Sequence, residues 1–487
     1  MTFNQVVWGS NPQWLIEENT RKTLIKVFRD FYIIGAEVET GVMESINMTE
    51  GNAGRHLIKY AVPLILGNFF QLTYNVVDSI ILGRFVGKEA LAAAGMANPI
   101  MNIIILGISG ICVGAGVLMS EFFGAGKWEL LKKEVATIVI FGCGVSIVVI
   151  ASGSLLAVPL LRILSVPKSL IEFTSSYLRI VFIGVPFTFF YNALAMALKS
   201  IGDSKTPLKF LVFSSLLNGA LDLIFIGGLG FGIICSAVTT VVAEAMSAVL
   251  SIIYVYKKVE LLRPGREDIR VDKELLRKTL QYGSITAIQQ LCQPVGKLLI
   301  QGSVNKLGVD VIAAYNIVTR IDDFAYTPEQ SIAHGITTFV AQNRGAGNNE
   351  RIRKGFREGL KLEVVYWALI CIIVSLFNKA IIGLFINVEI EKDIVYIGSQ
   401  YLTVMSFFYL FPAFTNGIQG FFRGMGNMKV TLISTYIQAS LRVIFTAIFA
   451  PRIGIYGICF ASVIGWICML LYEVPRYFKE KRINGCI

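Results

Sequence analysis

The sequence predicts an all-α polytopic membrane protein with twelve transmembrane helices, arranged as two pseudo-symmetric six-helix bundles. Three observations lead to this prediction. The chain of 487 residues is 54% hydrophobic and only 16% charged, more apolar than a soluble protein of this length needs to be. Apolar runs long enough to cross a bilayer follow one another along the chain. Several short motifs also occur twice, which indicates two related halves.

The apolar runs begin after a polar N-terminal region. They cover about residues 58–82, 89–119, 134–161, 173–198, 207–229, 232–256, 275–300, 309–341, 359–386, 395–421, 430–450 and 454–475. A spanning helix needs roughly 20 apolar residues, so several runs are long enough to tilt or bend. Prolines inside the runs mark expected kinks. They are Pro63, Pro99, Pro186, Pro294, Pro328 and Pro412.

The polar segments between the runs divide the chain into domains. We expect an N-terminal extension over residues 1–53, within which Met48 is the expected natural start. A first lobe follows over residues 54–257, then a basic linker over 258–274 and a second lobe over 275–478. Residues 479–487 form a short tail. An amphipathic surface helix around Leu15 to Ile34 is the alternative interpretation of the extension.

Positive charge gathers in alternate loops, for example at Lys132 and Lys133 and again at Arg353 and Lys354. Because basic loops stay on the cytoplasmic side, both termini should be cytoplasmic and the protein should lie in the plasma (inner) membrane. The net charge of +11 is explained by these loops, so we expect the lipid bilayer and small molecules as partners and no nucleic acid. A channel would show a filter motif or rings of charge in an oligomer; we expect a monomer.

The chain repeats itself. Gly124-Ala125-Gly126 recurs as Gly345-Ala346-Gly347, and Gly202-Asp203 recurs as Gly426-Asn427. Each half holds six runs, an even number, so both halves enter the membrane from the same side. Parallel repeats of this kind are typical of carriers that rock around a central site.

The first run carries a polar stripe. Gln71, Asn75 and Asp78 follow at spacings of four and three, so they share one face of a helix. A charged group near mid-bilayer costs at least about 2.5 kcal/mol, which indicates that the stripe faces an interior and is a candidate functional site. The alternative is that Asp78 reaches the interface beside Arg84 and Lys88.

Several function classes are excluded by what the sequence lacks. The eight cysteines form no CxxC pair, and His56 and His334 are the only histidines, so we expect no metal site and no cofactor. No catalytic constellation or nucleotide-binding motif occurs, which argues against an enzyme and against ATP-driven transport.

The sequence resembles the multidrug and toxic compound extrusion (MATE) family over the range from Thr49 to about Phe478. The resemblance is carried by Pro63, Asn75–Gly83, Leu91-Ala92-Ala93, Gly124-Ala125-Gly126, Gly202-Asp203, Asn218–Asp222 and Gly232. It implies two six-helix bundles around a V-shaped cleft. It also implies efflux of organic cations and other drugs from the cytoplasm, driven by inward H⁺ or Na⁺.

The resemblance further implies a cation or proton site in the first lobe, at Asp78, Asn218, Asp222, Tyr177 and Thr240. Asn218 and Asp222 are one helical turn apart, so the amide can support whatever the carboxylate holds. A structural hydrogen bond between helices is the alternative. Two carboxylates in one low-dielectric interior should repel each other and share a proton. We therefore expect H⁺ antiport centred on Asp222 and Asp78, with Na⁺ as the second candidate.

The second lobe departs from the family pattern. Its seventh run offers Gln289, Gln293 and Lys297 where the Na⁺-coupled branch has acids, and the repeat places Arg442 opposite Asn218. Other polar residues are candidates for a substrate cavity. They are Gln71, Asn75, Asn192, Gln289, Gln293, Arg320 and Asp323.

Some polar residues keep more than one interpretation. Arg320 and Asp323 can pair at i, i+3, and the charge cluster from Arg320 to His334 is left open between charge neutralisation and substrate contact. Glu244 has no predicted role. The alternative function is a flippase for a lipid-linked oligosaccharide or cell-wall precursor, and a non-transporting scaffold or receptor is a third class. The substrate itself is not predicted.

Overall fold

The computed structural model describes residues 46–164 and 166–483, and within these ranges it is built from helices without β-strands. Most of the predicted N-terminal extension, residues 1–45, lies outside the described residues. Polar caps explain several helix starts. Asn52 accepts a hydrogen bond from the Arg55 amide at 3.0 Å, and Asp272 accepts one from the Glu274 amide at 2.9 Å.

The first half of the described chain forms α2 (Ala53–Ile81), α3 (Lys88–Gly124), α4 (Trp128–Ile163), α5 (Lys168–Ser200), α6 (Lys205–Asp222) and α7 (Ile233–Lys258). The second half forms α8 (Lys273–Val304), α9 (Val309–Gly345), α10 (Asn349–Gly383), α11 (Lys392–Phe408), α12 (Leu410–Gly424), α13 (Met428–Ile453) and α14 (Ile455–Ile483). Each predicted apolar run overlaps one of these helices, or the consecutive pair α11 and α12. The largest differences are at α10, which begins ten residues before its run, and at α14, which ends eight residues after its run.

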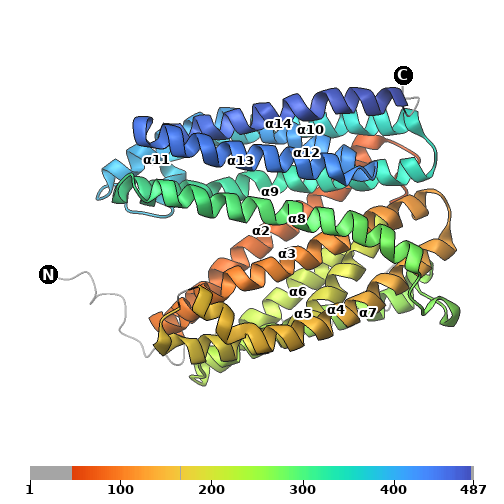
Figure 1. The fold of residues 1–487 in the computed structure, drawn as a ribbon, viewed down its shortest axis with the longest axis horizontal. Coiled ribbons are helices and arrows are strands. Elements are labelled where there is room, and N and C mark those ends of the chain that lie inside the picture. Colours follow the sequence, from red (N-terminus) through yellow and green to blue (C-terminus); the bar gives the residue numbers. More distant parts are fainter. Residues whose placement is uncertain (1–45, 165, 484–487) are drawn as a thin grey trace.

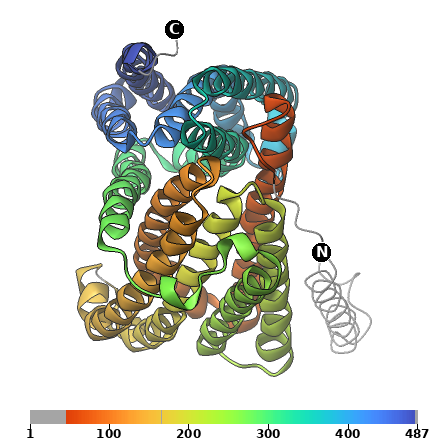
Figure 2. The same cartoon turned by 90° about the vertical axis from the view of Figure 1, so that its right-hand side faces the viewer.

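The two halves lie side by side as separate groups of helices. Figure 1 shows α8 to α14 above and α2 to α7 below, and the end-on view in Figure 2 shows the same division. By length and composition, nine helices in the described ranges can cross a membrane, or ten if α11 and α12, bent by 43°, form one span. The polar helices α8 and α9 do not meet that criterion, so twelve spans stay a prediction.

The backbone repeats between the halves. Gly87 and Gly308, which begin equivalent helices, have φ values of 106° and 100°. Gly126 and Gly347, in the turns after α3 and α9, have φ values of 67° and 69°. Side chains rarely adopt this left-handed region. The same backbone requirement therefore recurs at equivalent places, as the repeated motifs indicate.

The halves meet closely where α3 crosses α8 and α9. A Cβ atom at Gly114 would lie 2.4 Å from the backbone nitrogen of Gly283, and one at Gly124 would lie 1.8 Å from the carbonyl oxygen of Gln342. Both contacts are near the turns with most of the basic residues, and we call this end of the molecule the basic end. Glycine is what allows the backbones to approach so closely.

The first helix links the two halves. Leu57 and Tyr60, near the start of α2, are buried in one apolar cluster with Ile336 of α9. The Tyr60 hydroxyl is hydrogen-bonded to Thr338 at 2.9 Å. Because these contacts join residues far apart in sequence, the start of α2 belongs to the packing of the second half.

The contacts between the halves stop part-way along α2. Asn68 donates a hydrogen bond to Ser331 at 3.2 Å, and the rings of Phe69 and Phe324 lie 6.0 Å apart. Beyond this ring contact, no hydrogen bond, ion pair or ring contact joins the halves within residues 46–164 and 166–483. Gln71 and Asn75 are exposed there. The hydrogen bonds and ring contacts that join the halves are thus found toward the basic end of the molecule.

Candidate functional site

Asp78 of α2 and Asp222 at the end of α6 form an acid pair inside the first half. The two carboxyl groups are close enough to interact electrostatically with each other. Asp222 has no exposed surface. Oδ1 of Asp78 and Oδ2 of Asp222 are buried without a partner in the described part of the chain. Two carboxylates can bond to each other only through a shared proton, so this arrangement is suited to holding one.

The two helices that carry the acids change their winding beside them. α6 ends at Asp222 and continues as the π-helical turn η2 (Leu223–Gly228). α2 continues beyond Asp78 as the π-helical turn η1 (Leu82–Val86). Such turns are rare and often occur at functional sites. Neither was predicted from the sequence, because the apolar run continues through both turns without a break.

Thr239 of α7 supports the pair. Its hydroxyl donates a hydrogen bond to Oδ1 of Asp222. The family resemblance implied Thr240 as part of the cation or proton site. Thr240 is half-buried and makes no side-chain hydrogen bond to the described residues, so its part in coupling stays a prediction. Thr239 and Thr240 are adjacent, and only the rotation of α7 decides that Thr239 faces α6.

The other residues expected at the site surround the acids. Asn218 is buried one turn before Asp222, and its Nδ2 has no hydrogen-bond acceptor in the described ranges. Tyr177 of α5 interacts electrostatically with both acids, as does Tyr74 of α2. The structure therefore brings together Asp78, Asn218, Asp222 and Tyr177, while their part in coupling stays a prediction.

Glu244 of α7, which the sequence left without a role, belongs to the same interior. It interacts with Tyr177 and accepts a hydrogen bond at 2.7 Å from the Thr188 hydroxyl of α5. Asn192 is anchored nearby, because its Nδ2 donates to the Thr188 carbonyl at 2.8 Å. Thr188 thus connects Glu244 and Asn192, although neither spacing nor charge along the sequence pointed to this contact.

The polar stripe of α2 divides between two environments. Asp78 is half-buried and turns toward Asp222, whereas Gln71 and Asn75 are exposed on the part of α2 that lies beyond the contacts with the second half. The stripe is therefore shared between an acid that is turned into the first half and two amide side chains at the surface of α2.

In the second half, Gln289 does not line a cavity as expected. It is buried and donates hydrogen bonds to Gln419 at 2.9 Å and Thr435 at 3.1 Å, and it accepts one from Thr431 at 3.0 Å. These bonds join α8, α12 and α13, so Gln289 is part of the packing. Gln293 is more exposed and reaches Gln438 at 3.4 Å.

The expected pair of Arg320 and Asp323 does not form. Asp323 instead pairs with Lys297 of α8, with Nζ 2.5 Å from Oδ1. Arg320 is exposed and makes no ion pair within residues 46–164 and 166–483. The helical spacing allowed the predicted pair, but Lys297 on the neighbouring helix competes for the same carboxylate. Asp322, which directly precedes Asp323, is buried and accepts a hydrogen bond from the Tyr409 hydroxyl.

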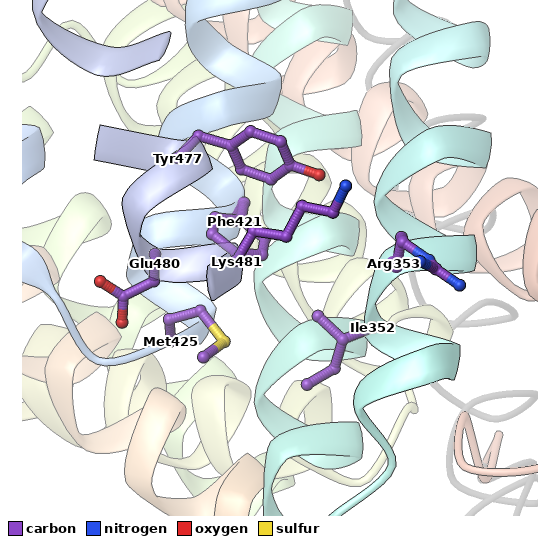
Figure 3. Close-up of a pocket in the computed structure, with 7 residues that line it drawn as sticks. All are labelled: Ile352, Arg353, Phe421, Met425, Tyr477, Glu480 and Lys481. Atoms are coloured by element: carbon purple, nitrogen blue, oxygen red, sulfur yellow. The ribbon is translucent and has the colours of Figure 1, made fainter. Parts of the chain in front are cut away.

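A shallow depression at the basic end is separate from the acids. Ile352, Phe421, Met425 and Tyr477 form its apolar floor between α10, α12 and α14, with Lys481 at its edge (Figure 3). None of the predicted site residues lines it. Its position near the ends of these helices gives no route to the interior of either half.

Comparison with known proteins decides the family. The MatE family model matches residues 63–224 and 286–448, one stretch in each half. The chain belongs to the MATE family. It is 30% identical over 417 residues to the probable multidrug resistance protein YpnP of Bacillus subtilis, covering 85% of this chain and 93% of that protein. It is 22% identical over 438 residues to the FAD transporter of Shewanella oneidensis, covering 88% and 95%.

Solved MATE structures have the same fold. An outward-facing MATE family transporter of the MOP superfamily superposes with a TM-score of 0.84 at 21% identity, covering 92% of this chain and all of that one. Membership in this family makes the chain a multi-pass membrane protein of a transporter class with small-molecule substrates, rather than an enzyme. The comparisons do not favour the flippase alternative.

Proposed function

We propose that this MATE protein is a secondary active transporter that exports small organic molecules in exchange for inward protons. The observation that carries the proposal is the acid pair of Asp78 and Asp222 inside the first half. Oδ1 of Asp78 and Oδ2 of Asp222 are buried there without a hydrogen-bond partner in the described ranges. Neither acid has an ion pair in the described part of the chain. A proton is the smallest ligand that removes the repulsion between two carboxylates in a low-dielectric interior.

Proton binding then competes with substrate. A proton arriving from the open side reduces the charge of the pair from two negative charges to one. The repulsion inside the pair is thereby removed, which lets the surrounding helices close and weakens the attraction for a cationic substrate. Release of the proton on the other side restores the charge. Organic cations are the substrates that such an exchange favours, because their charge is the one that the ionised pair attracts.

The proposed movement is a rocking of two six-helix bundles, with α8 and α9 crossing the membrane as well and both termini in the cytoplasm. The contacts of α3 with α8 and α9 at the basic end, together with the exposed Gln71 and Asn75 beyond them, support a state that is closed toward the cytoplasm. Rocking around these contacts exchanges access between the two sides.

Na⁺ is the second candidate for the coupling ion. Asn218 and Thr239 stand beside the two carboxylates and supply the amide and hydroxyl oxygens that a small hard cation prefers. Transport by the purified protein therefore has to be measured with each ion gradient imposed alone.

The test uses proteoliposomes loaded with an organic cation, with H⁺ and Na⁺ gradients applied separately. We expect a proton gradient alone to drive efflux, and Asp78→Asn and Asp222→Asn each to abolish it while the protein stays folded and inserted. Asp310→Asn, an exposed acid in the first turn of α9, is the matched control and should transport at the wild-type rate. Uphill export by both site variants at the wild-type rate would refute the mechanism.

A further inference from the structure

The second half contains two glutamates that the proposed mechanism does not use. Glu329 of α9 and Glu363 of α10 have no exposed surface, and they interact electrostatically with each other. Ionised carboxylates are almost never buried completely unless they are paired with a positive charge. Within residues 46–164 and 166–483, neither glutamate has an ion pair.

One polar side chain of the neighbouring helix α12 contacts the acid pair. Nδ2 of Asn416 on α12 donates to Oε2 of Glu329 at 3.3 Å. The adjacent Gly417 faces Glu363, because a Cβ atom built there would lie 3.8 Å from Cγ of Glu363. Both glutamates therefore converge on the same step of α12, from α9 and from α10.

Three carboxyl oxygens at this place have no hydrogen-bond partner in the described ranges. They are Oε1 of Glu329 and both oxygens of Glu363. A fully buried acceptor without a donor is costly, and it is rare in native proteins. The titratable groups that interact with the pair are tyrosines: Tyr326 of α9 with Glu329, and Tyr366 of α10 with both acids. Both are neutral, so neither balances a negative charge.

We propose that Glu329 and Glu363 form a second proton-binding site, located in the second half between α9, α10 and α12. A proton on Glu363 removes the charge of a fully buried carboxylate, and with it the repulsion between the two acids. The site binds and releases this proton during the transport cycle. Asn416, the hydrogen-bond donor to Glu329, is half-buried. Glu329 therefore lies on the less enclosed side of the pair.

The internal repeat does not relate this second site to the acid pair of the first half. Asp78 and Asp222 belong to the first and fifth helices of their half, whereas Glu329 and Glu363 belong to the second and third helices of theirs. The two acid pairs therefore lie in different halves and on non-equivalent helices. Exchange at both pairs gives a transporter that moves one proton more per cycle than the first pair alone provides.

The proposal is tested by infrared difference spectroscopy of the purified protein between acid and alkaline pH, following the carbonyl band of protonated carboxyl groups. Isotope labelling of glutamate carboxyl carbons separates the glutamates from Asp78 and Asp222. We expect a glutamate band that titrates in the wild type and is lost in Glu329→Gln and in Glu363→Gln. Glu473→Gln, which changes another fully buried acid of the second half, is the matched control and should keep the band.

Proton counting gives the functional arm. The proton-to-substrate ratio, measured from the reversal of transport in imposed gradients, should fall by one in Glu363→Gln. If a variant does not fold, the wild-type glutamate band decides. Glu134→Gln, Glu244→Gln and Glu473→Gln are then used to subtract the other enclosed glutamates. A glutamate band that does not respond to pH would overturn the proposal, because the proton would then be permanent. The spectroscopic result holds whether or not efflux proves to be driven by protons.

Discussion

Thr239 donates to the Asp222 carboxyl, and the neighbouring Thr240 does not. We therefore predict that Thr239→Ala lowers proton-driven efflux by about 10-fold, because leaving a buried acceptor without its donor costs about 1–3 kcal/mol. Thr240→Ala should leave efflux unchanged, and Thr239→Ser should restore it. Rates in proteoliposomes measure this. Equal losses in both alanine variants would show that the rotation of α7 assigned here is wrong.

Asp203, in the turn between α5 and α6, is a second residue with a defined task. Its Oδ1 accepts hydrogen bonds from the amides of Lys205 at 3.1 Å and Thr206 at 3.0 Å at the start of α6. We predict that Asp203→Ala lowers the free energy of unfolding by about 1 kcal/mol, as loss of a helix cap does, while Asp203→Asn keeps an acceptor. Thermal melting in detergent measures the difference.

The pH dependence of that stability has a definite sign. Burial raises the pKa of the Asp203 carboxyl above its usual range. The folded protein then binds the proton more tightly than the unfolded chain, so the contribution of Asp203 is largest at low pH and is lost as the pH rises through the raised pKa. Asp203→Asn should remove this decline. A steeper decline in the variant would contradict the burial of the carboxyl.

At the residue scale, the sequence predicted the acids well and their partners poorly. Asp78 and Asp222 could be found because a carboxylate in an apolar run is rare. Thr239 could not be separated from Thr240, and Lys297 could not be assigned to Asp323, since both contacts depend on how neighbouring helices are rotated. Glu363 was missed because it stands near the polar start of its run, where a charge is expected at the membrane surface.

Among the helices, the crossing of α3 and α8 depends on glycine. We predict that Gly114→Leu opens the basic end, because its Cβ would lie 2.4 Å from a backbone nitrogen that cannot move alone. Spin labels on the basic ends of α3 and α8 should report a longer distance. Gly107→Leu is the control, since a Cβ there meets no atom within 4 Å. An unchanged distance in Gly114→Leu would mean that the close approach at Gly114 does not keep the basic ends of α3 and α8 together.

Helix positions were the part of the fold that composition predicted best. Long apolar runs bounded by basic turns leave little choice of boundary, and each run coincides with a helix or with the pair α11 and α12. The π-helical turns after Ile81 and Asp222 were not predictable, because a change of winding alters no hydrophobic pattern. The break between Phe408 and Leu410, by contrast, was predicted, because Pro412 inside this run marks a kink and the two helices are bent by 43°.

The molecule as a whole is held closed at the basic end by an ion pair between its halves, Glu121 of α3 with Arg344 of α9. We predict that Glu121→Arg and Arg344→Glu each favour opening of this end by about fivefold, which corresponds to roughly 1 kcal/mol for a partly exposed pair. The double swap should restore the wild-type distribution. Distances between spin labels across the basic end measure these populations.

Failure of the double swap to rescue the single variants would mean that the pair does not hold the halves together.

The duplication of the chain was predictable at this scale, because the glycine motifs recur in order. The packing of the start of α2 against the second half was not predictable. It depends on contacts such as that of Tyr60 with Thr338, which join distant parts of the chain.

The polarity of α8 and α9 has a consequence for biosynthesis. Each acidic or basic residue at the centre of a helix opposes insertion from the translocon by about 2.5–3.5 kcal/mol, and α9 carries Arg320, Asp322 and Asp323 within four residues. Such a helix enters the lipid poorly alone. Its two acids have partners elsewhere: Asp323 pairs with Lys297, and Asp322 accepts a hydrogen bond from Tyr409, which is made only after α10 and α11. Ribosomes must therefore complete most of the second half before α9 reaches its final position.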